Sequence, residues 1–142
     1  MDHYRALAAR LRHELGIPLV LDGPPGANFA ADEGAVPHYS SLPGLIYATR
    51  RAAAIVGVDS GPLHLAAALG KPGVAIFGPT DPARNGPYGD SLHVLRTPAA
   101  ATTYKRGTAI DLSMRNISPD EVFEALRAIM GARRRPAGSL AE

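Results

Sequence analysis

A predicted strand, a tight turn and a short predicted helix follow one another directly in the middle of the chain, and this order limits the fold more than any other feature. Residues 55–58 form an apolar run typical of a buried strand, and residues 63–69 have the composition of a short apolar helix. Ser60, Gly61 and Pro62 form the turn between them. A helix that begins directly after a strand presents unpaired backbone N–H groups and the positive end of its dipole. Such a helix start is suited to bind a phosphate group.

A second strand with a polar loop follows, and strands and helices alternate along the rest of the chain. Residues 74–77 predict the strand, and residues 78–82 predict a loop with Gly, Pro and a hydroxyl residue. Residues 22–26 also predict a loop, whereas residues 28–33 are ambiguous. Apolar spacing and capping residues predict helices over residues 4–15, 42–53, 63–69 and 119–130. Gly16 closes the first of these helices and Gly131 the last. The predicted strands cover residues 17–21, 55–58, 74–77 and 92–95.

This alternation predicts an α/β domain with a mostly parallel sheet. We expect the domain to cover residues 1–131 and a flexible tail to cover residues 132–142. Ligands of such sheets bind at the carboxyl ends of the strands. The loops that begin at Asp59 and Gly78 both follow strand ends. We therefore expect the two loops to lie at the edge of the sheet where a ligand binds.

The composition limits the class of protein. The 142 residues are enough for one domain with a core, and no cysteine is present for disulfides or thiolate metal sites, so a cytoplasmic location is expected. No apolar run approaches the roughly 18–20 residues that span a membrane, and the N-terminus has no signal-peptide pattern. The net charge of +2 allows an anionic ligand but does not indicate nucleic-acid binding. No metal site is expected, because no partner at metal-ligand spacing accompanies the histidines His3, His13, His38 and His93.

Three ordered motifs closely resemble the lipopolysaccharide heptosyltransferase family, glycosyltransferase family 9. They are DSGPLHLAAALGKP at residues 59–72, FGPTDP at residues 77–82 and GPYG at residues 86–89. The helix start ISPDEV at residues 117–122 is also similar to that family. The resemblance covers most of residues 42–130 and, more weakly, the first forty residues. It implies a GT-B fold, in which two Rossmann-like domains enclose the active site and the C-terminal domain binds a nucleotide-sugar donor, typically ADP-heptose, without metal or cofactor.

The resemblance implies that this chain corresponds to an incomplete, truncated C-terminal domain. It begins on the helix that, in the family, follows the first strand and a phosphate-contacting loop of this domain. The family's catalytic carboxylate and acceptor surface lie on the other domain, so no catalytic residue is assigned here. We expect the isolated chain to be inactive and its sheet to lack a partner strand near residues 17–21. Exposed backbone at that place predicts self-association or a partner domain.

The resemblance assigns donor binding first to the turn and helix that start at Asp59. Asp59 is expected to bind sugar hydroxyls, although a helix cap is the alternative. Ser60 and Gly61 are expected to contact the diphosphate, or to serve the turn alone. Pro62 is expected to shape the helix start. His64 is expected to bond a phosphate oxygen and stabilise the leaving diphosphate, whereas a purely structural histidine is the alternative.

Further donor-binding candidates lie on neighbouring loops. Thr80 and Asp81 are expected to line the sugar-diphosphate pocket, or equally to form a side-chain-supported turn. Arg84 is a weaker phosphate candidate, because an arginine on a loop is commonly just solvated. Weaker candidates as well are the three residues that correspond to the family's segment beside the base, Ser40, Ser41 and Leu42. Ser41 is equally explained as a helix cap.

One family feature is absent at its usual place. A glutamate shortly after the second strand commonly grips the ribose in the family, but residues 23–28 contain no glutamate. Asp22, Asp32 or Glu33 are the possible substitutes. This departure puts nucleotide affinity and base choice in doubt.

The function that the resemblance implies is sugar transfer. The complete enzyme is expected to move a sugar, heptose from ADP-heptose, to a lipopolysaccharide core acceptor by direct displacement with inversion. Its partners are then a nucleotide-sugar and an acceptor that brings the protein near the membrane. Two alternatives remain open at this point: a non-catalytic nucleotide-binding or interaction module, and another GT-B enzyme such as a sugar-nucleotide epimerase.

Overall fold

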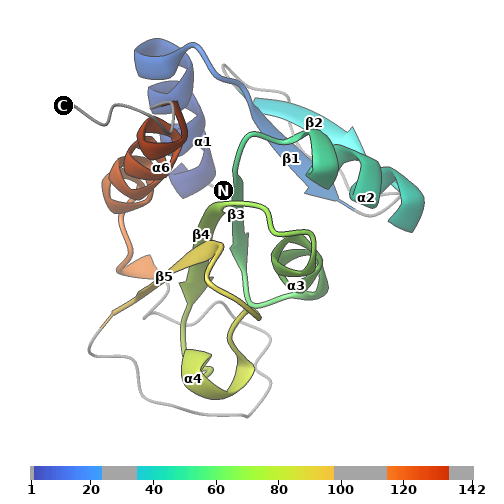
Figure 1. Cartoon of the computed structure of the whole chain (residues 1–142). Helices are drawn as coiled ribbons and strands as arrows, with labels where there is room; N and C mark the ends of the chain where they lie inside the picture. The colour runs from blue at the N-terminus through green and yellow to red at the C-terminus, as the bar shows by residue number, and fades with distance from the viewer. Residues whose placement is uncertain (1, 24–34, 98–114, 135–142) are drawn as a thin grey trace, which may run out of the picture.

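The computed structural model describes residues 2–23, 35–97 and 115–134, and these form an α/β fold (Figure 1). The expected fold class is confirmed. The elements, in chain order, are α1 (Asp2–Arg10), the π-helical turn η1 (Leu11–Leu15), β1 (Leu19–Gly23), β2 (Ala35–Tyr39), α2 (Leu42–Arg51), β3 (Ile55–Val58), α3 (Gly61–Ala68), β4 (Gly73–Phe77), α4 (Pro82–Asn85), β5 (Leu92–Arg96) and α6 (Pro119–Arg134).

The described strands form two parallel sheets. One sheet has the order β1-β2, with Val20 opposite Val36, and the other has the order β3-β4-β5, with Val56 opposite Val74. The strands of both sheets run in the same general direction (Figure 1). Their carboxyl ends therefore lie on the same side of the molecule, as expected from the sequence.

Helices cover both faces of the sheet layer. Along β4, Val74 and Ile76 pack with α1 and α6, whereas Ala75 and Phe77 pack with Leu63 of α3. Because neighbouring residues of a strand point to opposite faces, the two helix groups lie on opposite sides of the layer. The first core consists of the buried residues Leu7, Leu11, Val74, Ile117, Val122, Phe123 and Leu126, and the second of Leu63, Ala67, Ala75, Phe77 and Leu92.

Arg10 connects the first helix to the last. Its guanidinium donates to Asp120 at 2.8 Å and to Glu14 at 2.7 Å, and lies 3.9 Å from the centre of the Phe123 ring. The hydrogen bond from Arg10 holds the pKa of Glu14 below its ordinary value, and the same bond raises the pKa of Arg10. A pair of oppositely charged groups thus joins residues far apart in the sequence around one buried aromatic ring.

Several predicted boundaries need correction. The strand predicted at residues 17–21 begins at Leu19, because Gly16, with φ of 67°, and Ile17 still close the preceding helix through hydrogen bonds to Arg12 and Leu11. It continues through Gly23, so the loop predicted at residues 22–26 was wrong at its first two residues. The last helix continues past Gly131 to residue 134, since Gly131 does not adopt the positive φ of a helix-ending glycine.

The sequence did not predict β2, whereas the expected gap in the sheet beside residues 17–21 is present among the described strands. Pro37 lies inside β2 and removes a donor, which hides an outer strand from pattern analysis. β1 pairs with β2, so the strand near residues 17–21 does have one partner. On its other side β1 has no partner among the described strands, because the sheet is interrupted between β1 and β3. The ambiguous segment 28–33 and most of the predicted tail lie outside the described residues.

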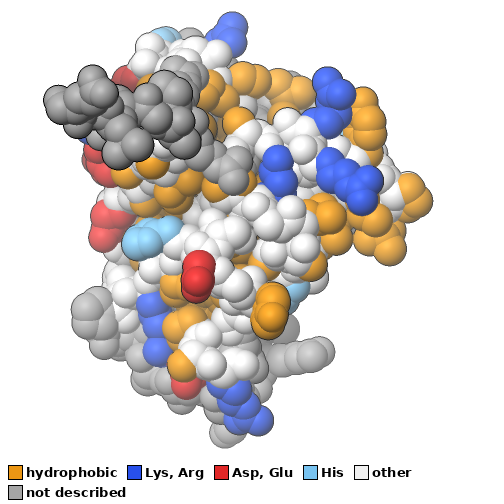
Figure 2. Space-filling view, viewed as in Figure 1, with side chains coloured by type: hydrophobic (Ala, Val, Ile, Leu, Met, Phe, Trp, Pro, Cys, Tyr) orange, Lys and Arg blue, Asp and Glu red, His pale blue; other side chains and the backbone are white. Residues whose placement is uncertain are grey.

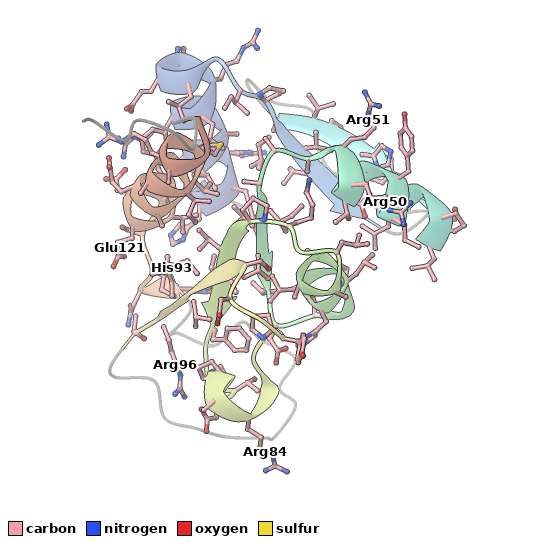
Figure 3. The ribbon with its side chains drawn as sticks, in the orientation of Figure 1. Arg50, Arg51, Arg84, His93, Arg96 and Glu121 are labelled. Atoms are coloured by element: carbon pink, nitrogen blue, oxygen red, sulfur yellow. The ribbon has the colours of Figure 1, made fainter. Side chains whose placement is uncertain are left out.

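Exposed apolar side chains gather on one part of the surface. Figure 2 shows them beside arginine side chains over the part that β1, β2 and α2 form. Arg50 and Arg51 lie there at the end of α2 (Figure 3). The large apolar side chains exposed on these elements are Val20, Val36, Tyr39, Leu42 and Tyr47. In the part of the chain that the structure describes, no helix has the length and apolar character needed to cross a membrane.

Candidate functional site

The carboxyl end of β3 brings a carboxylate and an imidazole together. Asp59 follows β3 directly, and His64 lies in the first turn of α3. The Nε2 atom of His64 lies 3.2 Å from the Oδ1 atom of Asp59, and the two side chains are 45% and 29% exposed. The helix-cap alternative for Asp59 is therefore not what the structure shows, since its carboxylate faces His64 and the N-cap residue is Ser60.

The start of α3 leaves polar groups and space for a ligand. The Ser60 side chain makes no capping hydrogen bond, although its carbonyl accepts from the His64 N–H at 3.2 Å. Pro62 has no N–H to satisfy. A Cβ atom built on Gly61 would have no neighbour within 4 Å, so nothing in the described structure requires a glycine there. The uncapped Ser60 side chain and the open space beside Gly61 therefore leave room for a ligand group to approach the helix start closely.

The loop after β4 lies beside this helix start, as expected from the pairing of β3 with β4. Asp81 is the N-cap of α4 and accepts a hydrogen bond from the Ala83 N–H at 2.9 Å, which is the turn alternative stated for it. Thr80 is half-buried next to it. Arg84 points away from the strand ends at the far side of α4 (Figure 3). The carboxylate of Asp81 therefore serves the turn in this structure.

Arg96 supports this loop, and the sequence analysis missed it. Its Nε atom donates to the Gly78 carbonyl at 3.0 Å from the end of β5 (Figure 3). The two residues are 18 positions apart. Only the pairing of β4 with β5 brings them together, so no local sequence signal identifies the contact.

A second carboxylate–imidazole pair lies at the ends of β1 and β2. The Oδ1 atom of Asp22 lies 2.8 Å from His38 Nδ1 and accepts a hydrogen bond from Ser40 Oγ, also at 2.8 Å. Sequence analysis gave His38 no carboxylate partner, because the pair depends on the unpredicted strand β2. Recognition of the segment as a strand parallel to β1 would have suggested it.

The three candidates at the start of α2 have different surroundings in the structure. Ser41 is the N-cap of α2, but its side chain makes no capping hydrogen bond. Leu42 is 65% exposed. Ser40 packs against Gly44, where an added Cβ would lie 2.7 Å from the Ser40 Cβ. The structure thus brings Ser40 to Asp22 and leaves Ser41 and Leu42 on the surface. Within the described residues, no group of three or more His, Asp or Glu side chains is arranged to hold a metal ion.

Comparison with known proteins identifies the family. The family model of glycosyltransferase family 9 (heptosyltransferase) matches residues 1–111. The chain belongs to this family. It is 43% identical over 58 residues to lipopolysaccharide heptosyltransferase 1 of Escherichia coli, which covers 41% of this chain and 18% of the relative. It is 36% identical over 80 residues to E. coli lipopolysaccharide heptosyltransferase 2, which covers 54% of this chain and 23% of the relative.

Solved structures of family 9 members have the same fold. The structure of E. coli ADP-heptose lps heptosyltransferase II matches with a TM-score of 0.78 and 27% identity, over 94% of this chain and 42% of that one. The E. coli heptosyltransferase WaaC with ADP matches with a TM-score of 0.67 and 25% identity, over 90% and 38% of the two chains. The family 9 resemblance and the Rossmann-like half of a GT-B fold are thereby confirmed. This chain spans less than half the length of either solved protein.

Proposed function

We propose that this chain binds the donor, a nucleoside diphosphate sugar of the ADP-heptose type, for transfer to a lipopolysaccharide core acceptor. The observation that carries the proposal is the Asp59–His64 pair beside the open helix start at Gly61, in a member of a heptosyltransferase family. The names of two structural neighbours include ADP-heptose and ADP, which supports this ligand class.

Each group at the helix start has a distinct role in the proposal. The diphosphate binds at the N-terminus of α3, where the Ser60 hydroxyl and the Gly61 N–H donate to it. Asp59 accepts hydrogen bonds from sugar hydroxyls, and His64 donates to a phosphate oxygen. The Asp59–His64 contact of 3.2 Å is at the long end for a hydrogen bond, and both groups are partly exposed. We therefore expect the pair to separate readily when the ligand binds.

Direct displacement with inversion follows in the proposal. As the sugar leaves, negative charge grows on the diphosphate, and the helix N-terminus and His64 stabilise it in place of a metal ion. Thr80 lines the pocket from the next loop. Asp81 is a less favourable candidate than expected, because its carboxylate already accepts the Ala83 N–H. The base that activates the acceptor comes from outside these residues, so the chain alone transfers no sugar.

Asp22 is the proposed replacement for the family's ribose-binding glutamate. Its carboxylate lies at the end of β1, on the same side of the molecule as Asp59. Ser40 and His38 fix its orientation through one of its two oxygens, Oδ1. In the proposal the other oxygen, Oδ2, accepts hydrogen bonds from a pair of ribose hydroxyls. In this proposal the protein works in the cytoplasm without a cofactor or nucleic acid, and its acceptor brings it near the membrane.

Calorimetric titration with ADP and with ADP-heptose tests the proposal. We expect both to bind, and His64→Ala to weaken binding about 10- to 150-fold, since a hydrogen bond to a charged group contributes about 1.5–3 kcal/mol. His93→Ala is the matched control, because His93 is exposed on β5, away from α3 (Figure 3). Equal affinity of the wild type and His64→Ala would contradict the assigned role. Failure of the wild type to bind either ligand would favour the non-catalytic interaction module.

A further inference from the structure

The outward side of α2 exposes an aromatic ring together with positive charges. Pro43, Tyr47, Arg50 and Arg51 are all exposed, and spacings of three and four residues place them on one side of the helix. Tyr47 is 62% exposed, and the guanidinium carbon of Arg51 lies 5.5 Å from the centre of its ring. The solvent side of a helix in a globular protein ordinarily carries mixed charged and polar residues. The exposed side of α2 therefore differs from an ordinary solvated helix face.

Two strand residues add apolar surface to this part of the molecule. Val20 and Val36 are register partners on β1 and β2 and are 52% and 48% exposed. Leu19 packs beneath α1 and α6, so its neighbour Val20 points to the opposite face of the layer, where α2 contacts α3. Figure 2 shows apolar and arginine side chains together over the part that β1, β2 and α2 form. We call this surface the α2 patch, and it comprises Val20, Val36, Leu42, Tyr47, Arg50 and Arg51.

The charge of the α2 patch is positive. Residues 34–58 include no aspartate or glutamate, so neither β2 nor α2 carries an acidic side chain. Lys71 brings a third cation to the end of α2, where its Nζ atom donates to the Arg50 carbonyl at 3.0 Å. Cations in the last turn of a helix suit its dipole, so the arginines alone would not indicate a ligand. Large apolar side chains exposed in the same place have no such explanation, and they mark an interaction surface.

We propose that the α2 patch binds the surface of an anionic lipid membrane. An acidic peptide would pair with the arginines but would not cover the aliphatic side chains, and an apolar protein surface would bury the arginines without a counter-charge. An anionic membrane supplies both chemistries, because its apolar layer lies directly beneath negative head groups. Arginine and tyrosine have an apolar body that ends in a polar group, so they fit the boundary between the two layers.

Lipid and nucleotide would occupy different places on the chain. Arg50 and Arg51 lie at the end of α2, which leads into the amino end of β3 (Figure 3). Asp59 and His64 lie beyond the carboxyl end of the same strand. The proposal therefore goes beyond donor binding and holds whether or not the chain binds a nucleotide.

Flotation of the full chain with vesicles in a density gradient tests the proposal and keeps aggregated protein out of the bound fraction. One set of vesicles is phosphatidylcholine alone, and the other includes about one third phosphatidylglycerol, which is anionic. We expect the chain to float with the anionic vesicles only, and we expect added salt to weaken binding because it screens the charges. Absence of flotation with anionic vesicles would overturn the proposal, and so would equal flotation with both sets.

Matched variants locate the binding surface. Arg50→Gln with Arg51→Gln should weaken binding to anionic vesicles about 30-fold, which corresponds to about 1 kcal/mol for each basic residue at such a surface. The control, Arg5→Gln with Arg12→Gln, makes the same change in net charge at exposed positions of α1 and η1 and should weaken binding less than about threefold. Tyr47→Ser keeps the net charge and should weaken binding about fivefold through the lost apolar contact.

Two results with these variants would overturn the assignment to α2. Equal losses of binding in the two arginine pairs would show that net charge alone, and not this surface, determines the binding. A dimer of the wild type in sedimentation velocity without lipid, abolished by Arg50→Gln with Arg51→Gln, would identify a second copy of the chain as the occupant. All the substituted side chains are exposed, so we expect each variant to keep the unfolding midpoint of the wild type in urea.

Discussion

Substitution of Gly61 by alanine tests separately whether the stability of the fold and the binding of the ligand require a glycine at this position. A Cβ atom at this position meets no atom of the described structure within 4 Å, and the φ angle of Gly61 is not positive. Alanine therefore fits without strain and reduces the conformational entropy of the unfolded chain. We expect Gly61→Ala to raise the free energy of unfolding by about 0.4–1 kcal/mol, measured by urea denaturation.

The same methyl group would occupy the space that the proposed diphosphate needs. If it prevents the close approach to the Gly61 N–H, the lost charge-assisted hydrogen bond is worth about 1.5–3 kcal/mol, or about 10- to 150-fold in the Kd for ADP measured by calorimetry. Gly131→Ala is the matched control. Its added Cβ also has no neighbour within 4 Å, but it lies in α6, far along the chain from the strand ends.

The control variant should gain about 0.5–1 kcal/mol in stability from the helix interior without a change in ADP affinity. Wild-type ADP affinity in Gly61→Ala would refute the placement of the diphosphate at the start of α3. A loss of stability in Gly61→Ala would refute the structural part of the reasoning, because it would mean that the space beside Gly61 is filled by protein.

Two further predictions concern the contact between α1 and α6. Phe123 has no exposed surface and lies under Arg10, so Phe123→Ala should lower the free energy of unfolding by about 3–5 kcal/mol in urea denaturation, whereas Tyr88→Ala, at an 89% exposed side chain, should change it by less than about 0.5 kcal/mol. The pKa of Glu14 is lowered by its hydrogen bond with Arg10, so the pair stabilises the fold above the ordinary carboxyl pKa of about 4.3, and this contribution disappears as the pH falls through the lowered value. Glu14→Gln should thus be less stable than the wild type at pH 7, and the difference should shrink below about pH 4; a constant difference would contradict the ion pair.

The sequence predicted the central part of the fold well. β3 has the predicted bounds, and β4 and β5 differ from their predicted bounds by one residue. The helix predicted over residues 63–69 is α3, which ends at Ala68 just before Gly70, with φ of 65°, and begins two residues earlier than predicted. These elements depend on apolar runs and on turn residues next to them, which are local signals. β2 was missed because a short outer strand with Pro37 lacks such a signal.

The contacts of the candidate site likewise divide into those that a local motif brings together and those that depend on strand pairing. Asp59 and His64 are five positions apart, so the strand–turn–helix motif already placed them on one loop and helix start. Nothing in that motif showed that the carboxylate faces the imidazole. Asp22 and His38 are 16 positions apart and required the pairing of β1 with β2. The Asp81 cap was an open alternative until the geometry of α4 was known.

The order of strands and helices, the helix start after β3 and the family motifs are properties of the sequence, because each depends on residues within one or two turns of each other. The break between β1 and β3 and the contacts of Arg10 with Asp120 and of Arg96 with Gly78 exist only in the folded chain. Such contacts follow from which strands and helices become neighbours. That choice depends on the burial of apolar faces summed over the whole layer, and no short segment contains this information.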